Sequence, residues 1–81
     1  MSNYIGSHQP RVLLKLKQVM ERTGLSRSSI YNKLDAKCPH YDPEFPRQVS
    51  IGASSVAWVE SEVEEWIESC IKKREESVRG R

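Results

Sequence analysis

No stretch of this 81-residue sequence approaches the roughly 18 consecutive apolar residues that a membrane-spanning helix requires. The first residues also lack the basic start, the apolar run and the small-residue cleavage site of a secretory signal. We therefore expect a cytoplasmic protein. Apolar residues make up only 37% of the chain and charged residues 30%, so we expect a single thin core without the deep substrate pocket of an enzyme.

Cysteine and histidine are scarce, with two of each in the chain. Cys38 and His40 form a single C-x-H pair around Pro39, whereas structural zinc sites show paired ligands at C-x₂₋₄-C or H-x₃₋₅-H spacing. We therefore expect no metal and no cofactor. Both cysteines are expected to be free thiols in a reducing compartment. Cys70 is expected to pack in the core, because it lies on the apolar face of a predicted helix.

Basic and acidic side chains are unevenly divided along the chain. Residues 1–34 carry six basic side chains and one acidic one, a net charge of +5, whereas residues 35–81 carry seven basic and ten acidic ones, a net charge of −3. No acidic residue occurs between Thr23 and Leu34. This division predicts that a polyanion binds the first segment, and ordinary surface charge is the alternative interpretation.

Residues 14–34 show the pattern of two short helices around a glycine. From Leu16, apolar residues recur at i, i+3 and i+4, which indicates one buried helix face. Gly24 is suited to end this helix, and Ser26 is suited to cap the start of the next one. The link is too short for antiparallel packing side by side, so the helices are predicted to cross steeply as a helix-turn-helix.

A small β-wing is predicted after a proline-rich loop. Residues 35–47 contain three prolines, and Tyr41 and Phe45 give this loop apolar anchors. Before the segment GASS, Val49 and Ile51 alternate with polar residues, and after it Val56 and Trp58 alternate with Ala57, which indicates a hairpin. Residues 11–14 (RVLL) form a short apolar run that is either a small strand or the lead-in to the first helix.

The last helix has the clearest pattern in the chain. Ser61 and Glu64 have the spacing of a capping box at its start. An apolar stripe with a period of 3.6 residues follows, made of Val63, Trp66, Ile67, Cys70 and Ile71. Trp66 on this stripe and Trp58 in the hairpin are expected to close the small core.

Together these elements predict a mainly α fold with a small β-hairpin, a winged helix-turn-helix in residues 11–75. Residues 1–10 mix small and polar types without periodicity, so they are predicted to form a flexible arm. Residues 76–81 are predicted to be a frayed tail.

The second helix presents a polar face suited to DNA. If Ile30 and Leu34 point to the core, the opposite face carries Arg27, Ser28, Tyr31 and Asn32, with Lys33 at its margin. Arginine pairs with guanine and asparagine with adenine through two hydrogen bonds each, and serine, tyrosine and lysine suit phosphate oxygens. The first turn of such a helix usually meets the base edges. The alternative is a short surface helix that shows its polar residues to water alone.

Three segments, LKQVMERTGLSRSSIYNKL, FPRQVSIG and WVESEVEEWI, occur in the order and spacing of the AlpA family of prophage regulatory proteins. The chain resembles that family over roughly residues 12–74. The resemblance implies a small winged helix-turn-helix, related in build to phage excisionases and to the DNA-binding end of MerR-type regulators. It also implies control of a prophage integrase or of neighbouring mobile-element genes, or an accessory role in excision.

By the family pattern, the segment TGLSRSSIY contains the recognition helix and residues 47–57 form the wing. Family members often carry an arginine directly after the wing glycine, whereas Ala53 follows Gly52 here. The wing contact then depends on hydroxyl and backbone groups and on Arg47 at the base of the wing. The candidate DNA-binding residues are therefore Arg27, Ser28, Tyr31, Asn32, Lys33, Lys17, Arg47, Ser54 and Ser55.

Three functions remain open. The first is a sequence-specific transcriptional regulator that docks a recognition helix (about 26–35) in the major groove of double-stranded DNA and a wing (about 47–59) on the backbone. The second is an excisionase-like factor that bends DNA, and the third is a protein-interaction adaptor that does not bind DNA. A homodimer or side-by-side copies would add specificity. RNA polymerase or an integrase are the candidate partners of the acidic last helix.

Overall fold

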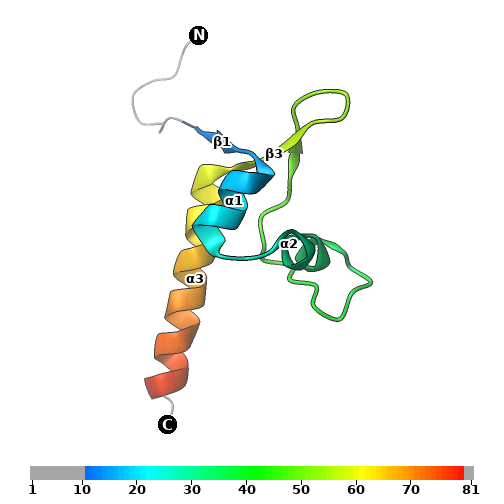
Figure 1. Cartoon of the computed structure of the whole chain (residues 1–81). Coiled ribbons are helices and arrows are strands. Elements are labelled where there is room, and N and C mark those ends of the chain that lie inside the picture. Colours follow the sequence, from blue (N-terminus) through cyan, green and yellow to red (C-terminus); the bar gives the residue numbers. More distant parts are fainter. Residues whose placement is uncertain (1–10, 80–81) are drawn as a thin grey trace.

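The computed structural model describes residues 11–79 and contains three helices and three short strands within that range (Figure 1). In chain order these are β1 (Leu13–Leu14), α1 (Leu16–Thr23), α2 (Arg27–Leu34), β2 (Val49–Ser50), β3 (Val56–Val59) and α3 (Glu60–Arg79). The predicted arm, residues 1–10, lies outside the described residues. The mainly α fold with a small hairpin is confirmed.

The sheet is antiparallel, with β3 in the centre and the strand order β1-β3-β2. Val49 pairs with Ala57 in the predicted hairpin, and the backbone N–H of Ile51 donates to the carbonyl of Ser55 at 2.9 Å to close its turn. On the other side, Leu14 pairs with Trp58. Of the two alternatives for residues 11–14, the strand is therefore the one that forms.

Every element except β2, whose two residues are exposed, contributes a buried side chain to a single core. Alternation in the strands and helical spacing in the helices turn these side chains inward from β1, α1, α2, the proline-rich loop, β3 and α3. In that order they are Leu14, Val19, Ile30, Phe45, Trp58 and Val63. Because the core is this small, the orientation of α2 depends on contacts with the loop and the sheet as much as on its own sequence.

The turn between α1 and α2 forms as the sequence predicts. Gly24 adopts a left-handed conformation with φ of 75°, and its N–H donates to the carbonyl of Met20 at 2.8 Å. The hydroxyl of Ser26 then accepts from the N–H of Ser29 at 3.1 Å, so it caps α2. The turn that joins the two helices is therefore set by local backbone chemistry.

The start of α3 differs from the sequence prediction. The helix begins at Glu60, directly after β3, so Ser61 lies inside the first turn and is not the N-cap of a capping box. The reason is tertiary: the N–H of Glu60, which has no partner within its own helix, donates to the carbonyl of Val12 at 2.7 Å. The strand pairing of β1 with β3 thus replaces the side-chain cap.

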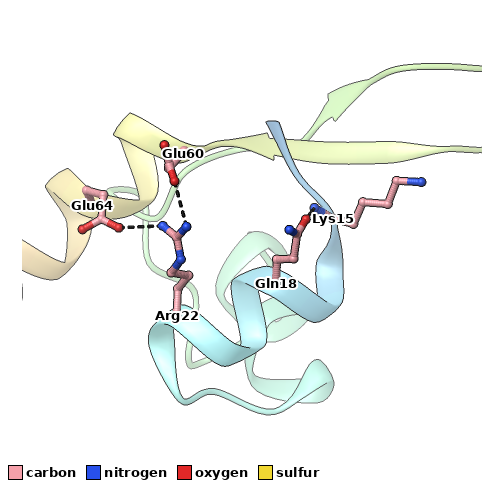
Figure 2. A network of polar contacts seen from close by, with 5 residues as sticks. All are labelled: Lys15, Gln18, Arg22, Glu60 and Glu64. Carbon is pink, nitrogen blue, oxygen red and sulfur yellow. Dashed lines mark hydrogen bonds and ion pairs between the residues drawn. The ribbon is translucent and has the colours of Figure 1, made fainter. Parts of the chain in front are cut away.

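Arg22 joins α1 to α3, as Figure 2 shows. Its guanidinium donates to the carboxylate of Glu60 at 2.8 Å and to that of Glu64 at 2.9 Å. At the other end of α1, the backbone N–H of Lys15 donates to the side-chain oxygen of Gln18 at 2.9 Å. The ion pairs of Arg22 join α1, and through it the helix-turn-helix, to α3, whereas the bond between Lys15 and Gln18 caps the start of α1.

The expectation that Cys70 packs in the core is wrong, because its side chain is exposed. The stripe on α3 is buried at Val63 and half-buried at Trp66, but Ile71 is already 38% exposed. The C-terminal half of α3 projects beyond the other elements (Figure 1). The apolar stripe therefore continues along the helix past the last residue that packs against the core. The helix continues to Arg79, and fraying of its last turn stays a prediction.

The proline-rich loop is ordered and tied to both neighbouring helices. Phe45 packs edge-on against the ring of Trp66, with ring centres 5.0 Å apart. The carboxylate of Asp42 accepts from the indole N–H of Trp66 at 3.0 Å, and the N–H of Asp42 donates to the carbonyl of Lys33 at 3.0 Å. The loop therefore holds the C-terminal end of α2 against α3.

The hydrogen bonds to Asp42 make the stability of this fold pH-dependent. Partial burial raises the pKa of its carboxyl, but hydrogen bonds from Trp66 and from the backbone of Glu44, with nearby lysine charges, outweigh burial and lower it. The resulting stabilisation is fully present above the ordinary pKa of 3.8 and is lost as the pH falls through the lowered value. We expect the advantage of wild type over Asp42→Asn in thermal unfolding to shrink between pH 6 and pH 3.

The matched control for this prediction is Glu21→Gln, because Glu21 is an exposed carboxylate on α1. Its effect on the melting temperature should be small, because this side chain forms no ion pair among residues 11–79. An Asp42→Asn variant that melts the same number of degrees below wild type at both pH values would contradict the assignment.

Candidate nucleic-acid interface

The exposed side of α2 carries the four residues that the sequence places there. Ile30 is fully buried, and a rotation of 100° per residue puts Ser28 and Asn32 on the opposite side of the helix. Arg27 and Tyr31 lie one turn apart on an adjoining flank, and all four side chains are exposed. Within α2 no side chain is acidic. The helix thus presents hydrogen-bond donors without a carboxylate to repel a phosphate.

Arg27, Tyr31 and Trp58 form a stack from the surface into the core. The guanidinium carbon of Arg27 lies 5.9 Å from the centre of the Tyr31 ring, within the range of a cation–π contact. The Tyr31 ring meets Trp58 edge-on, with ring centres 6.5 Å apart and an interplanar angle of 69°. Since Trp58 is fully buried, the stack orients Arg27 from a rigid base.

Lys33 lies apart from this group. Its side chain is half-buried, and its ammonium nitrogen lies 5.6 Å from the centre of the Trp66 ring. Lys33 therefore contacts α3 on the flank of α2 away from Arg27 and Tyr31. Its charge still contributes to the positive field of this face of the protein.

The remaining candidates lie on other elements. Lys17 is exposed in the first turn of α1, and Ser54 and Ser55 are exposed in the turn between β2 and β3. Arg47 is exposed just before β2, and its guanidinium donates to the hydroxyl of Tyr41 at 2.9 Å. Arg47 thus belongs to the proline-rich loop, which lies outside the helix-turn-helix segment.

A hollow of about 400 Å³ lies between α2 and the start of β2. It brings together two residues that the sequence predicts for DNA binding, Tyr31 from α2 and Arg47 from the base of the wing. The residues that line it are Tyr31, Leu34, Asp35, Arg47 and Gln48. Gln48 and Asp35 were not among the sequence candidates. The signal that was available is the pair of adjacent long polar residues, Arg47 and Gln48, directly before a predicted strand.

The structure changes the charge distribution inferred from the sequence. Arg22 is counted in the basic segment, but its two ion pairs with α3 neutralise it and withdraw it from the surface field. Lys15, Lys17 and Arg27 have no ion-pair partner among residues 11–79. Of the basic side chains in residues 14–34, those on α2 and at the start of α1 therefore stay available to a polyanion, and Arg22 does not.

The residues considered for a metal do not converge. Among residues 11–79, no group of three or more histidine, cysteine, aspartate or glutamate side chains is placed to hold an ion. Cys38 is half-buried, and its sulfur accepts a hydrogen bond from the backbone N–H of His40 at 3.4 Å. Within the same described range, no helix combines the length and the apolarity needed to cross a bilayer.

Two crossed helices joined at Gly24, followed by a hairpin whose central strand runs into a third helix, define a winged helix-turn-helix. Comparison with known proteins gives the same result at the level of sequence. Residues 12–71 match the family described as "Prophage CP4-57 regulatory protein (AlpA)". The chain therefore belongs to the AlpA family of prophage regulatory proteins.

Two curated relatives extend this comparison. The chain is 42% identical over 55 residues to the "DNA-binding transcriptional activator AlpA" of Escherichia coli K12, covering 68% of this chain and 79% of that protein. It is 43% identical over 61 residues to the "Uncharacterized protein ORF88" of Enterobacteria phage P4, covering 75% of this chain and 62% of that protein. No solved structure shows significant similarity.

Proposed function

We propose that this protein is a sequence-specific, DNA-binding transcriptional regulator of a prophage or mobile element. The observation that carries the proposal is the exposed, acid-free face of α2, with Arg27, Ser28, Tyr31 and Asn32 outward and Ile30 anchored in the core. The family membership and the name of the Escherichia coli relative support it. The protein acts by binding and carries out no reaction, and we place it in the cytoplasm.

In the proposed complex, α2 enters the major groove and its first turn meets the base edges. Arg27 pairs with a guanine through two hydrogen bonds, and Asn32 is suited to an adenine. Ser28 and Tyr31 contact phosphate oxygens, and Lys33 adds attraction to the backbone from the far flank.

The wing lies on the DNA backbone in this proposal. Ser54 and Ser55 contact phosphates through hydroxyl and backbone N–H groups, because the turn of the hairpin carries no cation. Arg47 supplies positive charge at the base of the wing and Lys17 supplies it from α1. Most of the binding energy is therefore expected from α2.

Selection of bound duplexes from a random pool, followed by mobility shift at several salt concentrations, tests this function. We expect an enriched sequence, and a log–log plot of affinity against salt with a slope of about −0.9 for each phosphate contacted. A pool without enrichment, or an affinity independent of salt, would overturn the proposal. A repeated half-site in the selected sequences would show that two copies bind side by side or as a homodimer.

Two alternative functions are compatible with the same fold. An excisionase-like factor would bend its DNA, and a circular-permutation assay distinguishes it from a regulator that leaves DNA straight. The exposed end of the α3 stripe at Ile71 favours a protein contact as well, with RNA polymerase or an integrase as candidate partners. Co-purification of such a partner without any DNA binding would favour the adaptor.

A further inference from the structure

The hollow between α2 and β2 has walls of different chemistry. Tyr31 and Leu34 form an aromatic and apolar wall from α2, and Asp35 follows them at the end of the helix. Arg47 and Gln48 form the opposite wall, from the segment that leads into β2. A guanidinium and a side-chain amide are both donors to phosphate oxygens, and the apolar wall suits the face of a sugar.

We propose that this hollow is a phosphate site, in which Arg47 and Gln48 hold one phosphodiester group of the DNA backbone and Tyr41 positions Arg47. The proposal rests on the proposed function, because it assumes that α2 lies against DNA. It adds two residues absent from the sequence prediction, Gln48 as a phosphate contact and Tyr41 as a positioning residue, and it assigns the group that Arg47 binds.

Tyr41 is suited to position Arg47. It is half-buried, its backbone N–H donates to the carbonyl of Cys38 at 3.0 Å, and its hydroxyl accepts from the guanidinium of Arg47 at 2.9 Å. A guanidinium has five N–H donors, so the bond to Tyr41 leaves the others for two oxygens of one phosphate. Holding the arginine in place before DNA arrives reduces the entropy that it loses on binding.

Charge decides on which side of Arg47 the phosphate binds. Arg47 also lines a second hollow, on the side of α3, and Glu44, Glu62 and Glu65 line the same hollow. Glu62 and Glu65 have no ion-pair partner among residues 11–79 and repel a phosphate there, whereas Glu44 pairs with Lys73 at 3.3 Å. The hollow beside α2 has only one carboxylate, that of Asp35, which accepts from the backbone N–H of Lys37 at 3.0 Å. Asp35 therefore weakens binding in the site and keeps the phosphate on the side of Arg47.

Quantitative DNA binding by four variants tests the site, using the selected duplex and a scrambled duplex of equal length. Arg47→Gln should lower affinity for both duplexes about 5- to 30-fold and reduce the salt slope by about 1. Gln48→Ala should lower affinity for both about 3-fold, and Asp35→Asn should raise it about 3-fold, because a neutral amide no longer repels phosphate.

Tyr41→Phe supplies the sharpest measurement, since it removes only the hydroxyl. We expect about a 3-fold loss of affinity with the salt slope unchanged, because the charge remains and only its placement is lost. In the Arg47→Gln background the same change should have no effect, whereas a merely structural role of Tyr41 would lower affinity equally in both backgrounds and would overturn the assignment.

Lys72→Gln is the matched control for charge, because Lys72 is exposed on α3 and away from the hollow. It should leave both affinity and salt slope nearly unchanged, and circular dichroism should show that every variant is folded.

If Arg27→Ala weakens binding but Arg47→Gln behaves as Lys72→Gln does, the phosphate site is wrong and the proposed function stands. If the scrambled duplex is unaffected by Arg47→Gln while the selected one is weakened, Arg47 reads a base instead and the phosphate assignment fails. If no variant binds differently and wild type shows no salt dependence, the proposed function itself fails.

Discussion

Replacing Trp58 with alanine is expected to remove about a quarter or more of the free energy of unfolding. Trp58 is fully buried in the central strand, and it contacts both the core and the ring of Tyr31. Truncating a buried tryptophan costs about 3–5 kcal/mol. At roughly 0.05–0.15 kcal/mol per residue, the whole chain has only about 4–12 kcal/mol of stability to lose. Urea unfolding followed by circular dichroism measures the loss without depending on tryptophan fluorescence.

Two control variants show how much of the loss of stability comes from the buried ring of Trp58. Trp58→Phe keeps a ring in the core and removes an indole N–H that has no hydrogen-bond partner among residues 11–79, so its loss of stability should be much smaller. Ile71→Ala truncates an apolar side chain that is 38% exposed on the projecting part of α3, and it should change stability little. A Trp58→Ala protein that unfolds cooperatively at the wild-type midpoint would refute the assigned core.

Replacing Arg27 with alanine should lower affinity for the selected DNA about 10- to 100-fold, the equivalent of about 1–3 kcal/mol for one bidentate base contact. Arg27 is exposed in the first turn of α2, and its contact with Tyr31 holds it at the surface without an ion pair among residues 11–79. Sequence preference should relax at one base pair, because a base contact carries specificity as well as affinity. Mobility shift on duplexes that differ at single positions measures both effects.

The comparison of three arginine variants isolates the cause. Arg27→Lys keeps the charge but cannot form the two parallel hydrogen bonds, so it should lose specificity while retaining most of the salt slope. Arg74→Ala removes an equal charge from an exposed site on α3 and should bind as wild type does. Equal losses in Arg27→Ala and Arg74→Ala would mean that only net charge matters, and α2 would not be the reading element.

Local signals predicted the parts of the fold that are set within a few residues. Gly24 ends α1 and Ser26 caps α2 because the bonds involved reach back or forward only three or four residues. The alternation around the hairpin predicted β2 and β3 for the same reason, since each strand shows two faces in its own sequence. The four exposed residues of α2 followed once Ile30 was assigned to the core.

Local signals failed where the partner lies far along the chain. Residues 12–14 form an uninterrupted apolar run without alternation, so β1 was identified only through its pairing with Val59 and Trp58. Ser61 and Glu64 have the spacing of a capping box, yet the first N–H of α3, that of Glu60, donates instead to the carbonyl of Val12. Cys70 continued a regular apolar stripe, and nothing in that stripe shows where the rest of the core ends.

The sequence by itself determined a winged helix-turn-helix with a donor-rich second helix, because caps, turns and helix faces depend on neighbouring residues. Only the tertiary structure decided which charges face a ligand. It pairs Arg22 with Glu60 and Glu64, 38 and 42 residues away, and it brings Arg47 across from Tyr31. The physical reason is that charges interact through space, and their distances are fixed by the shared core that orients each element.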